Sequence, residues 1–184
     1  RLMVALATPH PGDVILDPAA GAATFLVPCE QYLKEKYPAV FLDETARSSF
    51  FAEMFFGLEK DPLLLRIAAI RMMLHGIDDP QIKELGEILD EDFKKEMASL
   101  VLSNIPLSLI NPDADAKDGN TETMETPPTG VFYFDFILNA LKSGGRGVLL
   151  VPETLIASTA APHKKLRQDL ADHHLLQAVI SLQA

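Results

Sequence analysis

The sequence predicts an α/β fold with a doubly wound, mostly parallel sheet, and two observations predict it. Short, continuous apolar runs alternate with longer helical segments, which is typical of parallel strands buried on both faces. Several of these runs end in a polar residue followed by a turn, and ligands bind at such strand ends in parallel sheets. At 184 residues, 48% of them hydrophobic, the chain is long enough to bury the core of one domain.

The strands are predicted from apolar runs bounded by turn residues, and the helices from the segments between them. We expect strands at Asp13–Asp17, Phe55–Glu59, Ser99–Asn104, Gly145–Pro152 and Leu176–Leu182. We expect helices at Ala22–Lys36, Asp61–Gly76, Phe132–Leu141 and Pro162–His173. The clearest is Asp61–Gly76, because Asp stands at its cap, Pro in its first turn and Gly at its exit. We interpret its apolar stripe, Leu63–Leu74, as core packing.

Composition restricts the class of protein. The 16 basic and 26 acidic residues give a formal net charge of −10, which repels a phosphate backbone unless basic residues cluster on one face. The single cysteine, Cys29, excludes an internal disulfide. The sequence shows neither a signal peptide nor an apolar run near the roughly 18 residues that cross a membrane. We therefore expect a cytoplasmic protein without membrane contact.

The chain opens with Arg in the middle of an apolar pattern, so we expect residues 1–184 to be the core domain of a longer chain. Residues 111–130 are polar and rich in turn formers, which predicts a flexible surface loop. Within that loop, "DADAKDG" departs from a calcium loop at Lys117 and Gly119. The histidines lack zinc-ligand spacing. No metal site is predicted.

Two of the expected strands end in a carboxylate. Asp17 opens "DPAAGAATF", in which Gly21 alone lacks a side chain, so the turn is not the G-x-G-x-x-G of a pyrophosphate site. Its carboxylate either attracts a cationic ligand, of which S-adenosylmethionine is one, or only caps the turn. Glu59 either accepts the ribose hydroxyls of a nucleoside or is a surface residue. Its separation from Asp17 exceeds the roughly 20 residues of the dinucleotide fingerprint, which disfavours a dehydrogenase.

Two further residues are candidates for contacts with adenine. Glu87, in "LGEIL", either faces an adenine amino group or belongs to a solvated acidic run. Asn104 ends the expected central strand. Its side-chain oxygen and a nearby backbone carbonyl can accept both N–H bonds of an exocyclic amine, which makes that poor nucleophile more reactive. The alternative is an asparagine that caps the turn before Pro106.

Taken together and in order, these segments resemble the adenine-N6 DNA methyltransferase subunit of type I restriction–modification systems. "PGDVILDPAAGAATFL" is similar to the family's P-G-x-x-V-x-D-P-A-C-G-T-G-G-F-L, and "GLEKDP" to its G-x-E-x-D-P. "LGEIL" stands where the family has G-D-[ST]-L, and "LVLSNIPL" where a strand ends in N-P-P-F. The later segments "FILNALKSGGRGVLLVPETLI" and "LRQDLADHHLLQAVISLQA" also resemble the family, so the resemblance covers almost the whole chain.

The resemblance implies a Rossmann-like methyltransferase fold that binds S-adenosylmethionine. By position, the methionine side of the cofactor is assigned to Asp17, Pro18, Ala19 and Gly21, its ribose to Glu59 and its adenine to Glu87. The target amine is assigned to Asn104 and the Ile105 carbonyl, with the turn shaped by Pro106.

The sequence also departs from the family's motifs. G-T-G-G is replaced by Gly21-Ala22-Ala23-Thr24, and N-P-P-F by Asn104-Ile105-Pro106-Leu107. Leu107 lacks the aromatic face on which an extruded base stacks, a contact typically worth about 1–3 kcal/mol.

The leading hypothesis is therefore a DNA adenine-N6 methyltransferase that works with other restriction–modification subunits. A specificity subunit would supply most of the affinity for DNA, in keeping with the acidic charge. The alternative is a catalytically impaired subunit that keeps the fold as an assembly scaffold. A third possibility is a methyltransferase that acts on RNA, protein or a small molecule.

Overall fold

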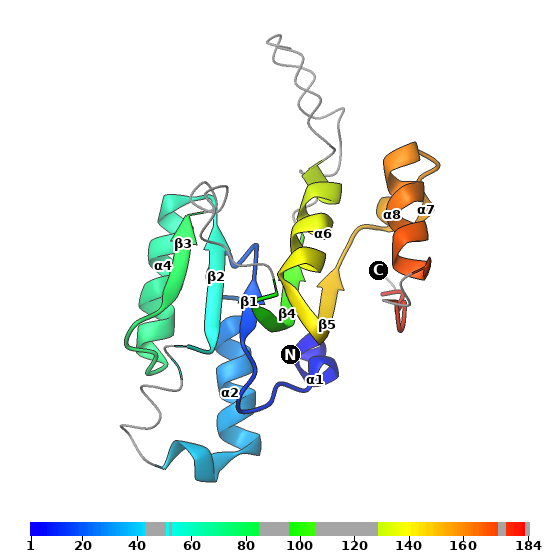
Figure 1. Ribbon diagram of the computed structural model, residues 1–184. Coiled ribbons are helices and arrows are strands. Elements are labelled where there is room, and N and C mark those ends of the chain that lie inside the picture. The colour runs from blue at the N-terminus through cyan, green and yellow to red at the C-terminus, as the bar shows by residue number, and fades with distance from the viewer. Residues whose placement is uncertain (43–50, 52, 85–95, 106–128, 173–175, 183–184) are drawn as a thin grey trace. The chain divides into compact units, whose positions relative to one another are not determined.

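The structure is a computed structural model, and it describes residues 1–42, 51, 53–84, 96–105, 129–172 and 176–182 (Figure 1). The strands are β1 (Ile15–Asp17), β2 (Phe55–Glu59), β3 (Gln81–Glu84), β4 (Ala98–Asn104) and β5 (Leu141–Leu150). The helices are α1 (Leu2–Ala7), α2 (Leu26–Lys36), the 3-10 helix η1 (Pro38–Phe41), α4 (Pro62–Leu74), α6 (Thr129–Ala140), α7 (Glu153–Ala157) and α8 (Ala161–Asp172). No described helix is both long and apolar enough to cross a membrane.

The chain divides into two compact units. Unit 1 comprises Arg1–Ile105 and Asp135–Leu150, and it contains the whole sheet. Unit 2 comprises Pro106–Phe134 and Val151–Ala184. Within unit 2, Arg167 on α8 donates hydrogen bonds to the carbonyls of Leu155 and Ser158, which joins α8 to α7 and the turn after it.

The sheet in unit 1 has five strands in the order β3-β2-β1-β4-β5, and every neighbouring pair is parallel. Successive strands move outward from β1 to β3, and the chain then returns to place β4 on the other side of β1. Ile15 is accordingly in register with Phe55 on β2 and with Leu100 on β4. The predicted doubly wound α/β class is confirmed, and the reversal of direction lies between β1 and β4.

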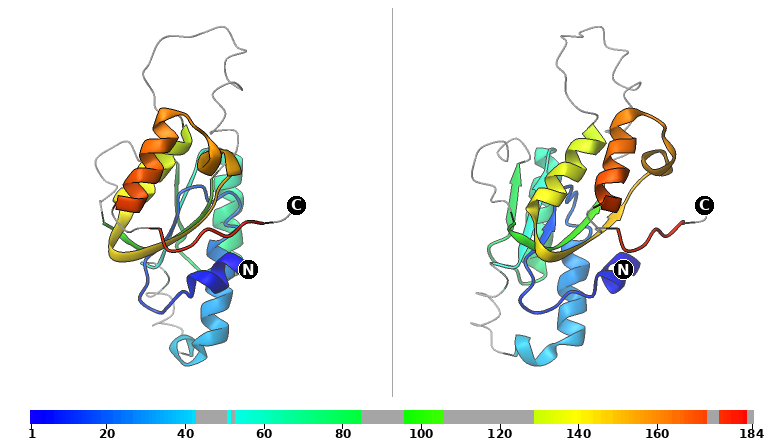
Figure 2. Two further views of the ribbon diagram at one scale, coloured as in Figure 1. Left: turned by 90° about the vertical axis from the view of Figure 1, so that its right-hand side faces the viewer. Right: turned by 45° about the vertical axis from the view of Figure 1, so that its right-hand side comes forward.

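Helices α1, α2 and α4 follow one another along the sheet. α1 lies against β4 and β5, α2 against β1 and β2, and α4 against β2 and β3 (Figure 1). α1 is also in contact with α2 (Figure 2). Because β1 is buried at every position and α2 presents an apolar face to it, the two form the centre of the core. Its largest fully buried side chains include Ile15, Leu26, Leu33, Phe51, Phe55, Met72 and Leu100.

The predicted elements are confirmed at β1, β2, β4, α4, α6 and α8, with shifted ends in several of them. The helix expected from Ala22 begins at Leu26, because Ala23 has a left-handed backbone (φ +56°) that no α-helix accommodates. The strand expected at Gly145–Pro152 spans Leu141–Leu150 instead. Its first residue, Leu141, was expected to end the preceding helix, and it pairs with Ala98 of β4.

Two predictions are wrong. Leu176–Leu182 is not a strand: none of the described residues pairs with it, and its apolar side chains are exposed. A strand exists only through hydrogen bonds to a neighbour, which a local apolar pattern does not supply. Nor is the stripe of Leu63–Leu74 wholly core packing, because Ala68 and Met72 alone on α4 are buried.

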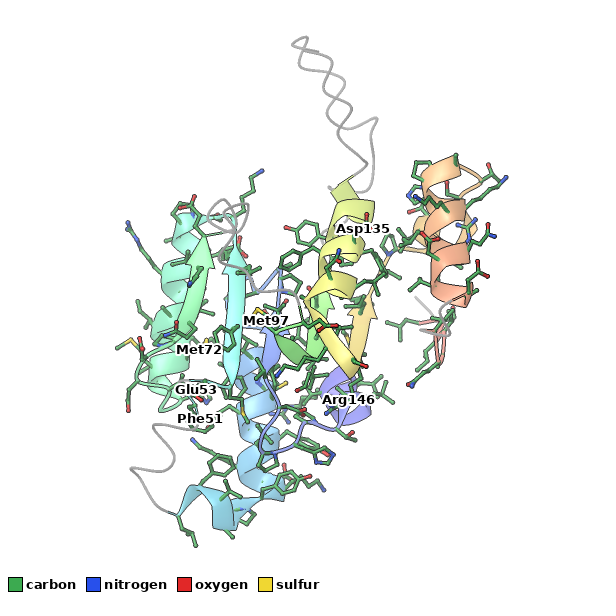
Figure 3. All side chains as sticks on the ribbon, in the orientation of Figure 1. Phe51, Glu53, Met72, Met97, Asp135 and Arg146 are labelled. Carbon is green, nitrogen blue, oxygen red and sulfur yellow. The ribbon has the colours of Figure 1, made fainter. Side chains whose placement is uncertain are left out.

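Arg146 on β5 binds the segment that follows α1, at the edge of the sheet opposite the carboxyl ends of the strands (Figure 3). Its guanidinium donates to the carbonyls of Ala7 (2.8 Å) and Thr8 (2.9 Å) and to both carboxylate oxygens of Asp13 (2.7 and 3.2 Å). Ser99 Oγ donates to the same carboxylate at 2.7 Å. Burial alone raises the pKa of Asp13, but the hydrogen bonds from Arg146, the His10 amide and Ser99 outweigh it and lower the pKa below its ordinary value.

We expect Arg146→Ala to reduce the free energy of unfolding by about 1–3 kcal/mol, because it leaves the buried Asp13 carboxylate without its cation. The range allows for the one-third exposure of the Arg146 side chain (33%). Urea unfolding measures the change, and Lys142→Ala, an exposed position on the same strand, is the control. Because the folded pKa of Asp13 is lowered, its stabilisation is present at neutral pH and is lost as the pH falls below about 4. An unchanged urea midpoint would contradict this role.

Candidate functional site at the carboxyl ends of the strands

The candidate site lies where the strand order reverses. In open α/β sheets ligands bind at this switch point, beyond the carboxyl ends of the strands. β1 ends at Asp17 and β4 at Asn104, and these two neighbouring strands run to the same edge of the sheet. Glu59 ends β2 on the other side of β1. The topology therefore brings the predicted residues Asp17, Glu59 and Asn104 to one edge of the sheet.

Asp17 is completely buried, yet its carboxylate is only partly satisfied. Oδ1 accepts the backbone N–H of Ala19 at 3.1 Å, whereas Oδ2 has no hydrogen-bond partner among the described residues. Burial, together with the charge of Glu59, raises the pKa of Asp17 to about 7, against the lowering effect of the Ala19 amide and the Ser103 hydroxyl. A buried acceptor left unpaired costs about 1–3 kcal/mol, a cost that a cationic or hydrogen-bonding ligand would remove.

Ser103 belongs to the site and was not predicted from the sequence. Its side chain is fully buried, one residue before Asn104 on β4, and close enough to Asp17 to lower the pKa of that carboxyl. Its Oγ nevertheless lacks a partner of good hydrogen-bond geometry among the described residues. The signal was present in "LVLSN": a hydroxyl interrupts an otherwise apolar strand at the end where ligands bind.

Hydrogen bonds from β2 and from α4 hold the backbone of the loop after β1. Gly21 donates its N–H to Glu59 Oε2 at 2.8 Å, and the other oxygen of Glu59 accepts the Asp61 amide at 2.8 Å. The Ala20 amide donates to the Leu58 carbonyl at 2.9 Å, and Arg71 on α4 donates to the Ala22 carbonyl at 2.9 Å. Glu59 thus positions the loop, and the remaining lone pairs of its carboxylate are available for hydroxyl donors.

Alanine replaces a glycine of the family's G-T-G-G at position 23, but the backbone there keeps the conformation that glycine favours. Gly21 and Ala23 both have left-handed backbones, with φ of +53° and +56°. An alanine in this region costs roughly 1–2 kcal/mol relative to its right-handed conformation. The hydrogen bonds to the loop and the complete burial of Ala23 hold that conformation in place. The substitution adds a methyl group to the core and leaves the loop backbone in glycine-like geometry.

Gly57 allows this loop to approach β2. A Cβ atom at this position would lie 2.5 Å from Ile82 Cδ1 on β3, 3.0 Å from Ala20 Cβ and 3.1 Å from Leu26 Cδ1. We expect Gly57→Ala to lower the free energy of unfolding by about 1–3 kcal/mol and to displace the loop, because a packed core cannot absorb the extra volume. Gly147→Ala on β5 is the matched control, since its Cβ would meet nothing closer than 3.8 Å. Thermal melting of the two variants compares them, and equal melting temperatures would refute the close approach.

The catalytic loop predicted from "NIPL" is described only at its start. Asn104 is exposed at the end of β4, and Ile105 is buried, with its amide donating to the Leu150 carbonyl at 3.2 Å. This bond continues the β4–β5 pairing one residue beyond the strand and fixes the backbone next to Asn104. Pro106, Leu107 and Glu87 lie outside the described residues, as does the predicted loop of residues 111–130 except for its last two residues, which begin α6.

The described site offers acceptors rather than phosphate ligands. Asp17, Ser103, Glu59 and Asn104 provide carboxylate, hydroxyl and amide oxygens at one edge of the sheet. Such a set favours a ligand with cationic and hydroxyl groups over one with phosphates, which the carboxylates would repel. Among the described residues, no cluster of three histidines, cysteines or carboxylates is placed to hold a metal ion.

The sequence is similar to those of a family of known proteins. The family described as N-6 DNA Methylase matches residues 1–184. The methylase subunit of the type I restriction enzyme StySPI from Salmonella potsdam is 28% identical over 190 residues, which cover 99% of this chain and 35% of that subunit. The EcoKI methylase subunit of Escherichia coli is 27% identical with the same coverage. The chain thus spans about a third of the length of these relatives.

Solved structures show the same fold. The crystal structure of the EcoKI M protein is similar with a TM-score of 0.72 at 27% identity, over 92% of this chain and 36% of that one. A class I S-adenosylmethionine-dependent methyltransferase from Listeria monocytogenes, at 16% identity, shares the fold with a TM-score of 0.61 over 93% of this chain and 50% of that one. The resemblance inferred from the motifs is confirmed, and the chain belongs to the N-6 DNA methylase family.

Proposed function

We propose that this domain catalyses the transfer of a methyl group from S-adenosylmethionine to the N6 amine of adenine in DNA. The observation that supports the proposal most directly is the placement of Asp17 and Asn104 on neighbouring strands at the switch point, in a chain of this family. One residue is suited to a cationic cofactor and the other to an amine substrate.

The residues present fit S-adenosylmethionine. Asp17 Oδ2 and Ser103 Oγ are buried at the ends of β1 and β4 without a partner of good hydrogen-bond geometry among the described residues, and the cofactor has an amino group and a cationic sulfonium. The loop of Pro18, Ala19 and Gly21 would face its methionine part, and Glu59 would accept its ribose hydroxyls. Glu87 is proposed for the adenine end by position in the sequence alone. When bound, the cofactor supplies an electrophilic methyl group.

Asn104 would orient and activate the target amine. Its side-chain oxygen and the Ile105 carbonyl would each accept one N–H bond, which directs the nitrogen lone pair toward the methyl group. The bond from the Ile105 amide to Leu150 holds this backbone in place before substrate arrives. The new C–N bond would form as the methyl C–S bond of the sulfonium breaks, which leaves a neutral thioether, and the nitrogen would give up one proton to water. No covalent bond to the protein is required. Pro106 and Leu107 are proposed to shape the turn beside the base.

The proposal includes partners. A net charge of −10 is unfavourable for a surface that must bind DNA on its own. We infer that a specificity subunit supplies most of the DNA affinity, and that the other subunits of a type I restriction–modification complex assemble with this protein. An intracellular, cytoplasmic location follows, because the proposed substrate is the cell's DNA.

Calorimetry on the full-length subunit tests the cofactor. We expect S-adenosylmethionine to bind with a micromolar dissociation constant and NAD to produce no heat, because the loop is not a pyrophosphate site. Absence of heat and of a thermal shift at millimolar S-adenosylmethionine would overturn the proposal. A second assay measures methyl incorporation at adenine N6 with the specificity subunit and DNA. Binding without methylation of DNA would instead favour the scaffold alternative, or a substrate other than DNA.

A further inference from the structure

Helix α4 has an apolar face on the side away from the sheet. Leu63 is 64% exposed, Ile67 40%, Ile70 58% and Leu74 82%. Their spacing along the helix is four, three and four residues, so at 100° per residue they form a single stripe. We call Leu63, Ile67, Ile70 and Leu74 the α4 stripe. Exposed leucines are common singly, but a continuous stripe of large side chains is not.

The α4 stripe lies opposite the face of the helix that packs on the sheet. Ala68 and Met72 are the buried residues of the helix, and α4 contacts β2 and the edge strand β3 (Figure 3). Arg71 reaches from the flank of the helix to the Ala22 carbonyl. On the helical wheel the centres of the buried pair and of the stripe are about 150° apart. The orientation of α4 is therefore fixed by its contacts, and rotation of the helix cannot bury the stripe.

The sequence of α4 is that of a helix covered on both sides. A helix at a protein surface normally alternates an apolar stripe with a polar face, whereas "LLLRIAAIRMML" is apolar around most of its circumference. The sequence accordingly predicts that the apolar stripe of Leu63–Leu74 is core packing. Among the described residues this prediction is wrong, because the α4 stripe is exposed. The composition of the helix would be explained if another element covered the stripe.

We propose that the α4 stripe is the docking site for an apolar helix of the same polypeptide, from the part of a full-length subunit that lies outside these 184 residues. The relatives are about three times as long as the matched stretch, so such a segment is available in proteins of this family. The four-three-four spacing matches the contacts of a second helix packed along α4.

The size of the stripe argues against a second copy as the occupant. It extends about 17 Å along the helix at 1.5 Å per residue, and a helix is about 10 Å wide. Stable interfaces between separate proteins bury about 800 Å² on each partner, which a strip of this size does not provide. A tethered segment does not need that area, because its effective concentration is high.

Cysteine labelling of the full-length subunit tests the proposal. Ile70→Cys places a thiol in the stripe, and Met73→Cys places one on the same helix outside it, at a similar exposure (58% and 54%). The native Cys29 is buried. We expect a maleimide to react with the Ile70→Cys thiol at least about tenfold more slowly than with the Met73→Cys thiol. Melting curves verify that both variants are folded.

A crosslink identifies the occupant. A short maleimide–diazirine reagent attached to the Ile70→Cys thiol is expected to link residue 70 to a peptide of the same polypeptide outside these 184 residues, at every protein concentration. Equal labelling rates for the two variants would overturn the proposal, because the stripe would then be uncovered. Protection that disappears on dilution, or a link between subunits of different isotopic mass, would overturn it in favour of a second copy. A link to any of residues 1–184 would overturn it in favour of a contact within this domain.

Discussion

Replacement of Asn104 by alanine is expected to lower the rate of DNA methylation about 10²–10³-fold and to leave the affinity for S-adenosylmethionine within about twofold. Loss of a preorganised hydrogen-bonding group that acts on the reacting atoms typically costs a factor of this size. The variant should remain folded, because Asn104 is exposed and the backbone beside it is held by the Ile105–Leu150 bond. A single-turnover assay with the specificity subunit and DNA measures the rate.

The control for Asn104 is another exposed asparagine, Asn139 on α6, whose side chain donates to the Asp135 carbonyl. Asn139→Ala should methylate DNA at the unchanged rate. If Asn104→Ala raised KM for DNA without lowering kcat, the residue would bind the substrate without activating it. If neither constant changed, Asn104 would be a turn cap, which is the alternative that the sequence analysis left open.

Much of the fold was predictable because local patterns and topology agree in this chain. β2 was predicted at the correct residues, and α4 was predicted from a cap, a proline and a terminal glycine that the structure shows in those roles. The Asp61 side chain accepts the Leu63 amide, as its position at the cap predicts. These features depend on neighbours in sequence, so the sequence alone is sufficient to locate them.

The failures share a physical cause, which is dependence on contacts that local sequence does not specify. Leu176–Leu182 has strand-like composition but no described partner, and the α4 stripe has core-like composition but no described cover. The left-handed backbone of Ala23, which delays the start of α2, could not be predicted because alanine rarely adopts this conformation. Ser103 became a candidate only when the fold placed it near Asp17. At the site, sequence located the residues at strand ends, and the structure added which of their atoms lack partners.

Replacement of Asp17 by asparagine is expected to stabilise the folded protein and to weaken its binding of S-adenosylmethionine. The pKa of Asp17 is about 7 in the folded protein and 3.8 in the unfolded chain, so the folded state binds an additional proton between these values. The free energy of unfolding therefore falls as the pH rises from about 4 to about 7, and stays low above that. Asn cannot ionise, so Asp17→Asn should be more stable at pH 8, by up to about 4 kcal/mol at about 1.4 kcal/mol per pKa unit.

The affinity for cofactor should change in the opposite direction. A cationic ligand favours the ionised carboxylate, so the unchanged protein should bind S-adenosylmethionine up to about tenfold more tightly at pH 8 than at pH 6. Asp17→Asn should bind it weakly and without this pH dependence. Urea unfolding and calorimetry at both pH values measure the two effects, with the exposed Asp135→Asn as control. A purely structural aspartate would lose stability on substitution, whereas a site residue that the fold keeps buried and partly unpaired for a ligand gains stability and loses affinity. A variant that is less stable at pH 8 would contradict the raised pKa of Asp17. A variant that keeps the pH-dependent affinity would show that Asp17 does not bind the cofactor.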